Sequence, residues 1–362
     1  MDIPLTADAT LRPLVLPARA DAGDAGELHE FAEVRNQVYR EVTGRDDQDL
    51  TPEALLPVLR SSADRTTHVW AVRRAGRIIG RAMVDVPMDE GARAVMATIE
   101  LLPSAWGQGI GRAILPHIEA AARRHGRTVI HNWTEQQAVD GPRLQPPTGF
   151  GSVPDDHAAR FLRRSGFTLE QVYRISVLEL DQACARLARA LESEAADVAR
   201  DYRVVSWLLP TPDAHVDGYA WMKSRMSTDA PSADLAADEE QWDADRLRRM
   251  EERERERGHT MLVTAAQHRA TGVLTAFTEL GIGRDGRATT HQNDTLVLRE
   301  HRGHRLGMLV KAAGLRAWTD VAPDSPRVIT YNAEENRPML AINEALGFTA
   351  RAYEGVWKKE LT

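Results

Sequence analysis

The stretch that decides the fold of this chain is His301-Arg302-Gly303-His304-Arg305-Leu306-Gly307. A short apolar run, 295–298, precedes it, and a helical pattern over about 306–318 follows it. A strand, a glycine-containing turn and a helix in this order leave backbone N–H groups unpaired at the positive end of the helix dipole. Glycine has no Cβ, so a ligand can approach that backbone closely. The stretch therefore suits a phosphate or pyrophosphate group, although a basic helix start also occurs for purely structural reasons.

The size and composition of the chain limit what it can be. Its 362 residues suggest two domains of ordinary size. Its net charge of −7 and its lack of a long basic run argue against nucleic acid as a partner. The single cysteine, Cys184, cannot form an internal disulfide and is expected to be a packing residue. Neither a signal peptide nor an apolar run long enough to cross a bilayer is present, so we expect a cytoplasmic protein without a membrane partner.

The second half of the sequence repeats the first. Gly107 and Gly303 are separated by the same interval as Gly111 and Gly307. In each half a hairpin and a strand precede the glycine turn, and a helix and a further strand follow it. The repeat predicts two copies of one domain, at 1–180 and 201–362, joined by an Ala-rich helix at 181–200. Two such turns in equivalent places strengthen the case for a phosphate-bearing ligand.

Two common phosphate-binding units do not fit this pattern. A dinucleotide-binding unit opens a βαβ segment and carries an acidic residue on the next strand, and neither half does so. Neither turn has the Gly-Lys-Ser/Thr ending of a nucleoside triphosphate loop.

The two turns resemble the signature of the GNAT superfamily of N-acetyltransferases, Gln/Arg-x-x-Gly-x-Gly/Ala. The first half has Trp106 in the leading slot and both glycines at 109 and 111. The second half has Arg302 in the leading slot, and Arg305 replaces the inner glycine. The second half also ends, as the family does, with Asn336, a short helix and Gly-Phe. The tandem arrangement is similar to that of mycothiol synthase and other actinobacterial acetyltransferases.

This resemblance implies a mixed α/β fold, with two tandem GNAT-like domains of bent sheet and helices on both faces. In each domain two central strands splay apart to admit acetyl-CoA or another acyl-CoA, and no metal is needed. Asn332 and Asn336 are candidate partners of the cofactor or simply caps of a strand and a helix. The implied cofactor-binding residues are Val297, Leu298, Arg302, Gly303, His304, Arg305, Leu306, Gly307, Asn332 and Asn336 in the second half, and Leu102, Gly107, Gln108, Gly109, Ile110, Gly111 and Arg112 in the first.

The implied reaction is direct transfer of an acyl group, most simply acetyl, to a primary amine of a small molecule in a ternary complex. An alkyl amine has a pKa near 10.4, so the enzyme needs a proton acceptor. On the strand before the second turn, His291 and Asn293 share one face and His291 is the better base. Glu100 is the candidate in the first half. The family's usual tyrosine slot holds Asn343 and Leu162, which cannot act as a phenol does.

The acceptor pocket is expected in the segment that follows the first strand of the second half, and the second half is favoured as catalytic. The alternatives are a non-catalytic acyl-CoA-binding or regulatory module and a protein or peptide N-acetyltransferase, and a homodimer is possible. The candidate acceptor-binding residues are Tyr219, Trp221, Arg225 and Asp229.

Overall fold

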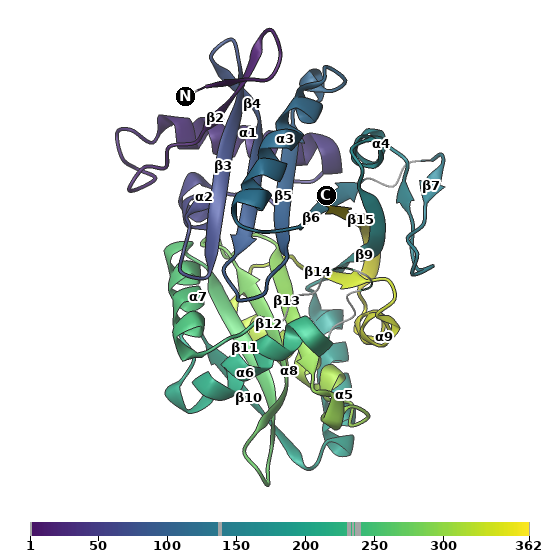
Figure 1. Cartoon of the computed structure of the whole chain (residues 1–362). Coiled ribbons are helices and arrows are strands. Elements are labelled where there is room, and N and C mark those ends of the chain that lie inside the picture. The colour runs from purple at the N-terminus through teal and green to yellow at the C-terminus, as the bar shows by residue number, and fades with distance from the viewer. Residues whose placement is uncertain (1, 137–139, 230–232, 234, 236–239, 362) are drawn as a thin grey trace. The chain divides into compact units, whose positions relative to one another are not determined.

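The computed structural model describes residues 2–136, 140–229, 233, 235 and 240–361, and they form two compact units. Residues 2–172 and 353–361 belong to unit 1, and residues 173–229 and 240–352 belong to unit 2. Both units are mixed α/β structures (Figure 1). In the described part of the chain, no helix is long and apolar enough to span a membrane.

The main-sheet strands of unit 1 are mixed parallel and antiparallel and follow the order β1-β2-β3-β4-β5-β6-β15. A two-stranded ribbon, β7 and β8, lies outside the main sheet. The strands are β1 (Ile3–Pro4), β2 (Ala9–Pro13), β3 (Arg65–Arg74), β4 (Arg77–Pro87), β5 (Ala94–Leu101), β6 (Val129–Gln136), β7 (Arg143–Leu144), β8 (Val153–Pro154) and β15 (Thr349–Glu360). The helices are α1 (Gly26–Thr43), α2 (Pro52–Leu59), the 3₁₀ turn η1 (Pro103–Ala105), α3 (Ile110–Arg124) and α4 (His157–Arg164).

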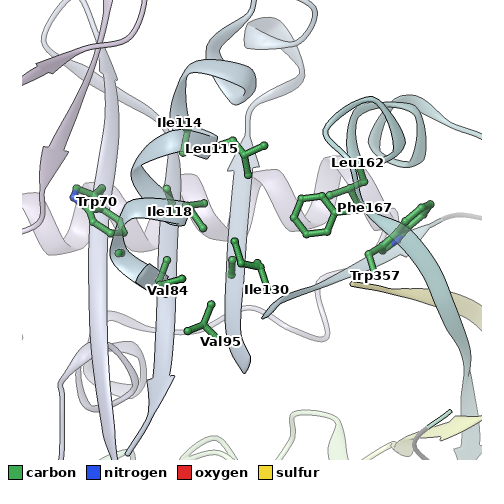
Figure 2. Close-up of a cluster of buried hydrophobic side chains, with 14 of the residues drawn as sticks. Trp70, Val84, Val95, Ile114, Leu115, Ile118, Ile130, Leu162, Phe167 and Trp357 are labelled. Carbon is green, nitrogen blue, oxygen red and sulfur yellow. The ribbon is translucent and has the colours of Figure 1, made fainter. Parts of the chain in front are cut away.

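Helices cover both faces of the unit 1 sheet, and the alternation of strand side chains explains why. Trp70 and its neighbour Val72 point into the cluster beneath α3, while the intervening Ala71 joins the cluster beneath α1 and α2. Ile114 and Ile118 lie one helical turn apart on α3 and pack against the sheet (Figure 2). The glycine turn is thereby fixed at the start of a buried helix.

Unit 2 has the strand order β9-β14-β13-β12-β11-β10, also with helices on both faces. One core lies between the sheet and α5 and α8, and another between the sheet and α6 and α7. The strands are β9 (Thr168–Glu179), β10 (Tyr202–Leu208), β11 (Thr260–His268), β12 (Leu274–Ile282), β13 (Thr290–Val297) and β14 (Arg327–Ala333). The helices are α5 (Gln182–Val198), α6 (Asp213–Asp229), α7 (Ala244–Glu256), the 3₁₀ turn η2 (Arg299–His301), α8 (Leu306–Val321) and α9 (Arg337–Ala345).

The central parallel strands of each unit pair over only three positions. In unit 1 these are 94–96 of β5 against 129–131 of β6, and in unit 2 they are 290–292 of β13 against 328–330 of β14. Beyond these positions β5 and β13 remain paired only with β4 and β12. The strands therefore part on the side of the glycine turn, which is the splay that the family resemblance implies.

The two halves exchange their last strands. From Tyr173 onward β9 pairs with β14 of unit 2, and from Tyr353 onward β15 pairs with β6 of unit 1. The predicted boundaries at 180 and 201 therefore differ from the compact units, because a strand's sequence does not specify which sheet edge it joins. The predicted connecting helix is α5, and its buried Cys184 packs in the core of unit 2 as expected.

Candidate functional site

The glycine turn of unit 1 has the conformation that its residues predict. Gly107 and Gly109 have φ of 70° and 81°, in the left-handed region that glycine adopts without strain. Gly109 is the N-cap of α3 and no side chain caps the helix, so its first N–H groups face a cleft of about 480 Å³. The cleft walls include Ile99, Leu101, Trp106, Gly107, Gly109, Ile110, Gly111, Arg112, His157, Ala158 and Phe161.

Unit 2 repeats this cleft with a different residue in the turn. Gly303 has φ of 88°, and Arg305 has φ of 56° at the position where unit 1 has Gly109. A left-handed arginine costs roughly 1–2 kcal/mol, and here it adds a charge to the N-terminus of α8, which also lacks a side-chain cap. The cleft again has about 480 Å³ and is lined by residues that include Thr295, Leu296, Val297, Arg302, Gly303, Arg305, Leu306, Gly307, Asn336 and Ile342.

The leading residue of each turn donates a hydrogen bond to the last residue of the preceding strand, but the donor is an indole in unit 1 and a guanidinium in unit 2. In unit 1 the Trp106 indole Nε1 donates to the carbonyl of Leu101 over 2.8 Å. In unit 2 the Arg302 Nε donates to the carbonyl of Val297 over 3.3 Å. Each contact ties the turn to the end of the splayed strand, so Trp106 replaces the arginine as a hydrogen-bond donor but not as a charge.

Unit 1 has a second cavity, of about 220 Å³, beside its cleft. The two hollows share wall residues at the end of β5 and the start of α4, where the rings of Trp106 and His157 stack at 3.5 Å and 21°. The described residues that line the cavity include three aromatic side chains and four carboxylates but no lysine or arginine. The shared residues are Ile99, Leu101, Trp106, His157 and Ala158; the aromatic residues are Tyr39, Trp106 and Trp133, and the acidic ones are Glu100, Glu135, Asp156 and Glu354.

Two of these carboxylates have strong partners of their own. Glu100 forms a two-pronged ion pair with Arg81, at 2.6 and 3.0 Å. Burial raises the pKa of Glu100, but Arg81, helped by Arg35, outweighs burial and holds that pKa below its usual value. Asp156 caps α4 by accepting from the Ala159 amide at 2.9 Å. Glu100 is thus held ionised and is a weak base.

The other two carboxylates face each other across adjacent strands. Glu135 of β6 and Glu354 of β15 are direct partners in the antiparallel register. Glu135 accepts from the Tyr39 hydroxyl at 2.7 Å and pairs with Arg45 at 2.6 Å. Glu354 has no hydrogen bond or ion pair to any residue that the structure describes. Burial, together with Glu135, raises the pKa of Glu354 to about 8, and Arg45 opposes this.

Unit 2 fills the corresponding position with its own ion pairs. When β5 and β13 are aligned by the residues that pair with their parallel neighbours, Asp294 of unit 2 corresponds to Thr98 of unit 1, which lines the acidic cavity. The Lys223 Nζ binds Asp294 at 2.5 Å and Glu279 at 3.0 Å, and the Tyr219 hydroxyl donates to Glu279 at 2.5 Å. Burial lowers the pKa of Lys223, but the two carboxylates outweigh it and raise that pKa. The lysine therefore stays charged and links Asp294 to Glu279 at the place in unit 2 that corresponds to the cavity of unit 1.

The comparisons with known proteins agree with this geometry. The model of the acetyltransferase (GNAT) family matches residues 28–140, which contain the unit 1 turn and cleft. A tandem GNAT protein from the clavulanic acid biosynthesis pathway is 26% identical, with 98% of each chain covered and a TM-score of 0.73. Residues 28–140 therefore form a GNAT acetyltransferase domain, and the whole chain has the fold of a tandem GNAT protein.

Other solved structures share the fold of the tandem GNAT chain. A GCN5-related N-acetyltransferase from Sphaerobacter thermophilus is 14% identical, with 99% of this chain and 97% of that chain covered and a TM-score of 0.63. No curated protein matches the chain. Proteins of the GNAT family use acyl-CoA, which supports acyl-CoA-dependent acetyl transfer as the general activity.

Most of the cofactor-binding residues predicted for the two GNAT clefts line them, but five do not. The amides of Leu102 and Leu298 donate to the neighbouring strands, to Ile79 and Thr275, and neither residue lines a cleft. In each unit the amide just after the splayed segment is hydrogen-bonded to the neighbouring strand, so it is not available to a cofactor. The other three also make contacts elsewhere: Gln108 with the Ser104 carbonyl, His304 with the Tyr202 ring, and Asn332 with Asn343.

The two residues predicted to be catalytic in unit 2 lie outside its cleft. His291 lies in the paired part of β13, opposite Ile329, and neither it nor Asn293 lines the cleft. The cleft begins only at Thr295, because the strands part after Gln292. The sequence indicates which residues alternate but not where two parallel strands separate.

The four residues predicted to bind the acceptor do not form one pocket. Tyr219 is fully buried in the Lys223 network, whereas Trp221 is 47% exposed, because two residues along a helix are turned by about 200°. Arg225 pairs with Asp229 at 2.7 Å, and only Asp229 lines the unit 2 cleft. Asn336 caps α9, as expected for one of its two roles, and it also lines that cleft.

The two positions where the family usually has a tyrosine, 162 and 343, hold no side chain that can act as a phenolic proton donor. Leu162 packs in the core of unit 1, and buried Asn343 donates to Asn332 at 2.7 Å. Glu354 is the residue that sequence reasoning missed. Its sequence signal is weak because β15 carries other charged residues, and its position acquires meaning only once β15 is known to pair with β6.

Proposed function

We propose that the protein is an acyl-CoA-dependent N-acyltransferase that moves acetyl from acetyl-CoA to the primary amine of a small molecule, and that unit 1 performs the transfer. One observation carries this proposal: the unit 1 cleft and its acidic cavity share a wall at the end of β5. A thioester in the cleft and an amine in the cavity would meet there, which favours direct transfer in a ternary complex. The proposal places transfer in the first half, whereas the sequence favoured the second.

The residues of the cleft suit the carrier. The uncapped N-terminus of α3, the left-handed glycines and Arg112 provide N–H groups and charge for a diphosphate. The open edge of β5, at Ile99 and Leu101, can pair with amides of an extended arm. Phe161 lies 3.2 Å from where a Cβ on Gly111 would be, so any other residue there would press on the Phe161 ring.

The neighbour from the clavulanic acid pathway supports a small-molecule acceptor over a protein one. That pathway makes a small molecule, and the neighbour spans the full length of this chain. The acceptor cavity of about 220 Å³ is also small.

For unit 2 we propose acyl-CoA binding without transfer. Its cleft keeps the uncapped helix and two arginines, Arg302 and Arg305. Its acceptor position, however, is bridged by Lys223 between Asp294 and Glu279. Such a half would bind the carrier as a regulatory or structural ligand.

The test is thiol release from acetyl-CoA with a panel of amines, combined with charge reversals in the two clefts. Arg112→Glu is expected to raise the KM for acetyl-CoA about tenfold or more, since a negative charge at the N-terminus of α3 opposes the diphosphate. Arg124→Glu, at the far end of the same helix, is the matched control and should leave the KM unchanged. Arg305→Glu should reduce the number of acetyl-CoA sites found by calorimetry from two to one. Thiol release that no amine stimulates would refute the function, and loss of release with Arg305→Glu alone would move it to unit 2.

A further inference from the structure

The acceptor cavity of unit 1 is built for a cation. Its wall combines four carboxylates with the aromatic side chains of Tyr39, Trp106 and Trp133. Aromatic faces attract an ammonium group, and more strongly where water is excluded. Two nearby arginines are already paired: Arg81 with Glu100, and Arg45 with both Glu135 and Asp47.

Glu354 differs from the other acidic residues because its charge is not matched. Glu100 is paired with Arg81, Asp156 caps a helix, and Glu135 is bound by Arg45 and Tyr39. Glu354 lies opposite Glu135 in the strand register, so the two side chains start about 5 Å apart and face the same cavity. An ammonium group between them would supply the missing positive charge.

We propose that Glu354 accepts the proton of the acceptor amine, and that the acceptor is a cationic alkylamine without a carboxylate or phosphate of its own. This inference rests on the proposed function and deepens it. A substrate anion in the cavity would meet four acidic side chains and, among the described wall residues, no lysine or arginine, so charge repulsion disfavours its binding. The residue is delivered to unit 1 by the exchanged strand β15.

The reaction then balances as follows. The ammonium group gives one proton to the Glu354 carboxylate and becomes a free amine. Its nitrogen attacks the thioester carbonyl carbon, the C–N bond forms and the C–S bond breaks. The second nitrogen proton goes to the departing thiolate, so the products are the amide, the thiol form of CoA and protonated Glu354. Glu354 loses its proton to solvent before the next turnover.

The raised pKa of Glu354, about 8, supports this role. A base works best when its pKa is near the operating pH and not far below that of the amine. The groups around Glu354 that set this value are Glu135 and Arg45, with Glu100, Asp156 and His157 in the same wall. Burial lowers the pKa of His157, so at neutral pH it is uncharged.

The experiment compares Glu354→Gln with Glu360→Gln, an exposed control on the same strand. Glu354→Gln is expected to lower kcat about 100-fold or more while acetyl-CoA binding by calorimetry is kept. The kcat/KM of the parent protein should level off near pH 8, the pKa of Glu354 in the free protein, whereas that of Glu354→Gln should keep rising with pH as the amine loses its proton unaided. Glu135→Gln should move the midpoint of the parent profile to lower pH by about one unit, because it removes a like charge.

The substrate class is tested with 1,5-diaminopentane and lysine, which differ by one carboxylate. The parent should favour the diamine at least about tenfold in kcat/KM, and Glu354→Gln should reduce that preference. A parent that acetylates amines while Glu354→Gln keeps its kcat and pH profile overturns the role of Glu354 and leaves the function standing. A preference for lysine overturns the substrate class, whereas no turnover of any amine by the parent overturns the proposed function itself.

Discussion

Lys311 is a charged residue placed where a charge is unfavourable, and replacing it should stabilise the protein. The residue lies on α8, fully buried. Its Nζ donates to the Gln292 Oε1 at 3.0 Å and lies 5.6 Å from the centre of the Phe348 ring. Burial lowers its pKa from 10.5 to about 7. We predict that Lys311→Met raises the free energy of unfolding at pH 7.

The magnitude follows from proton linkage. Between pH 7 and 10.5 the unfolded chain binds a proton at Lys311 that the folded chain does not, so folded stability rises with pH across this window. At pH 7 the lysine therefore costs the fold at most about 4 kcal/mol, at 1.36 kcal/mol per pKa unit. Methionine removes that cost but leaves the Gln292 oxygen without its donor, which costs roughly 1–3 kcal/mol. The expected net gain is about 1–3 kcal/mol.

Urea denaturation at pH 7 and pH 10 measures this directly. The gain from Lys311→Met should shrink or change sign at pH 10, where the parent lysine is neutral in the folded state. Lys223→Met is the matched control with the opposite sign, since it leaves Glu279 and Asp294 without their cation. A Lys311→Met protein that is less stable than the parent at pH 7, or an effect that is equal at both pH values, would refute the reasoning.

Two further predictions use other parts of unit 2. Burial raises the pKa of Glu254, but hydrogen bonds from His259 and Arg257 outweigh it and lower that pKa to about 2, so Glu254→Gln should cost about 3 kcal/mol above pH 4.5. In acid titrations followed by circular dichroism, this difference should vanish as the pH falls through about 2, and a constant difference would contradict it. Gly307→Val places a Cβ 2.9 Å from the Ile342 Cδ1 and should weaken acetyl-CoA binding to the unit 2 cleft about tenfold by calorimetry. Unchanged binding would mean that α8 and α9 adjust freely.

The local parts of the fold could be predicted from the sequence because they depend on near neighbours. Gly107 and Gly303 both have the left-handed conformation that a strand-to-helix turn requires, and each helix begins where the turn ends. The equal spacing of the two turns also predicted a duplicated domain before any contact was known. Even Arg305, which departs from the motif, keeps the backbone conformation of the glycine it replaces.

Side-chain placement was predicted less well, because it depends on pairing between distant segments. His291 alternates correctly with its neighbours on β13, yet it lies in the closed part of the strand pair. Tyr219 and Trp221 are close in sequence but lie on opposite sides of α6. In both cases the residue type suited the predicted role, but packing against distant segments places the side chain away from the cleft.

The exchange of last strands explains why the sequence did not point to the acidic cavity of unit 1. Glu354 belongs by sequence to the second copy, and only the pairing of β15 with β6 brings it opposite Glu135. The same pairing places Trp357 in the core of unit 1, where it joins Phe167 (Figure 2). A fragment that ended at residue 180 would thus lack both the base that we propose and the Trp357 of its core, and it would leave the edge of β6 unpaired. Unit 1 therefore requires the C-terminal strand, which ties its chemistry to the integrity of the whole chain.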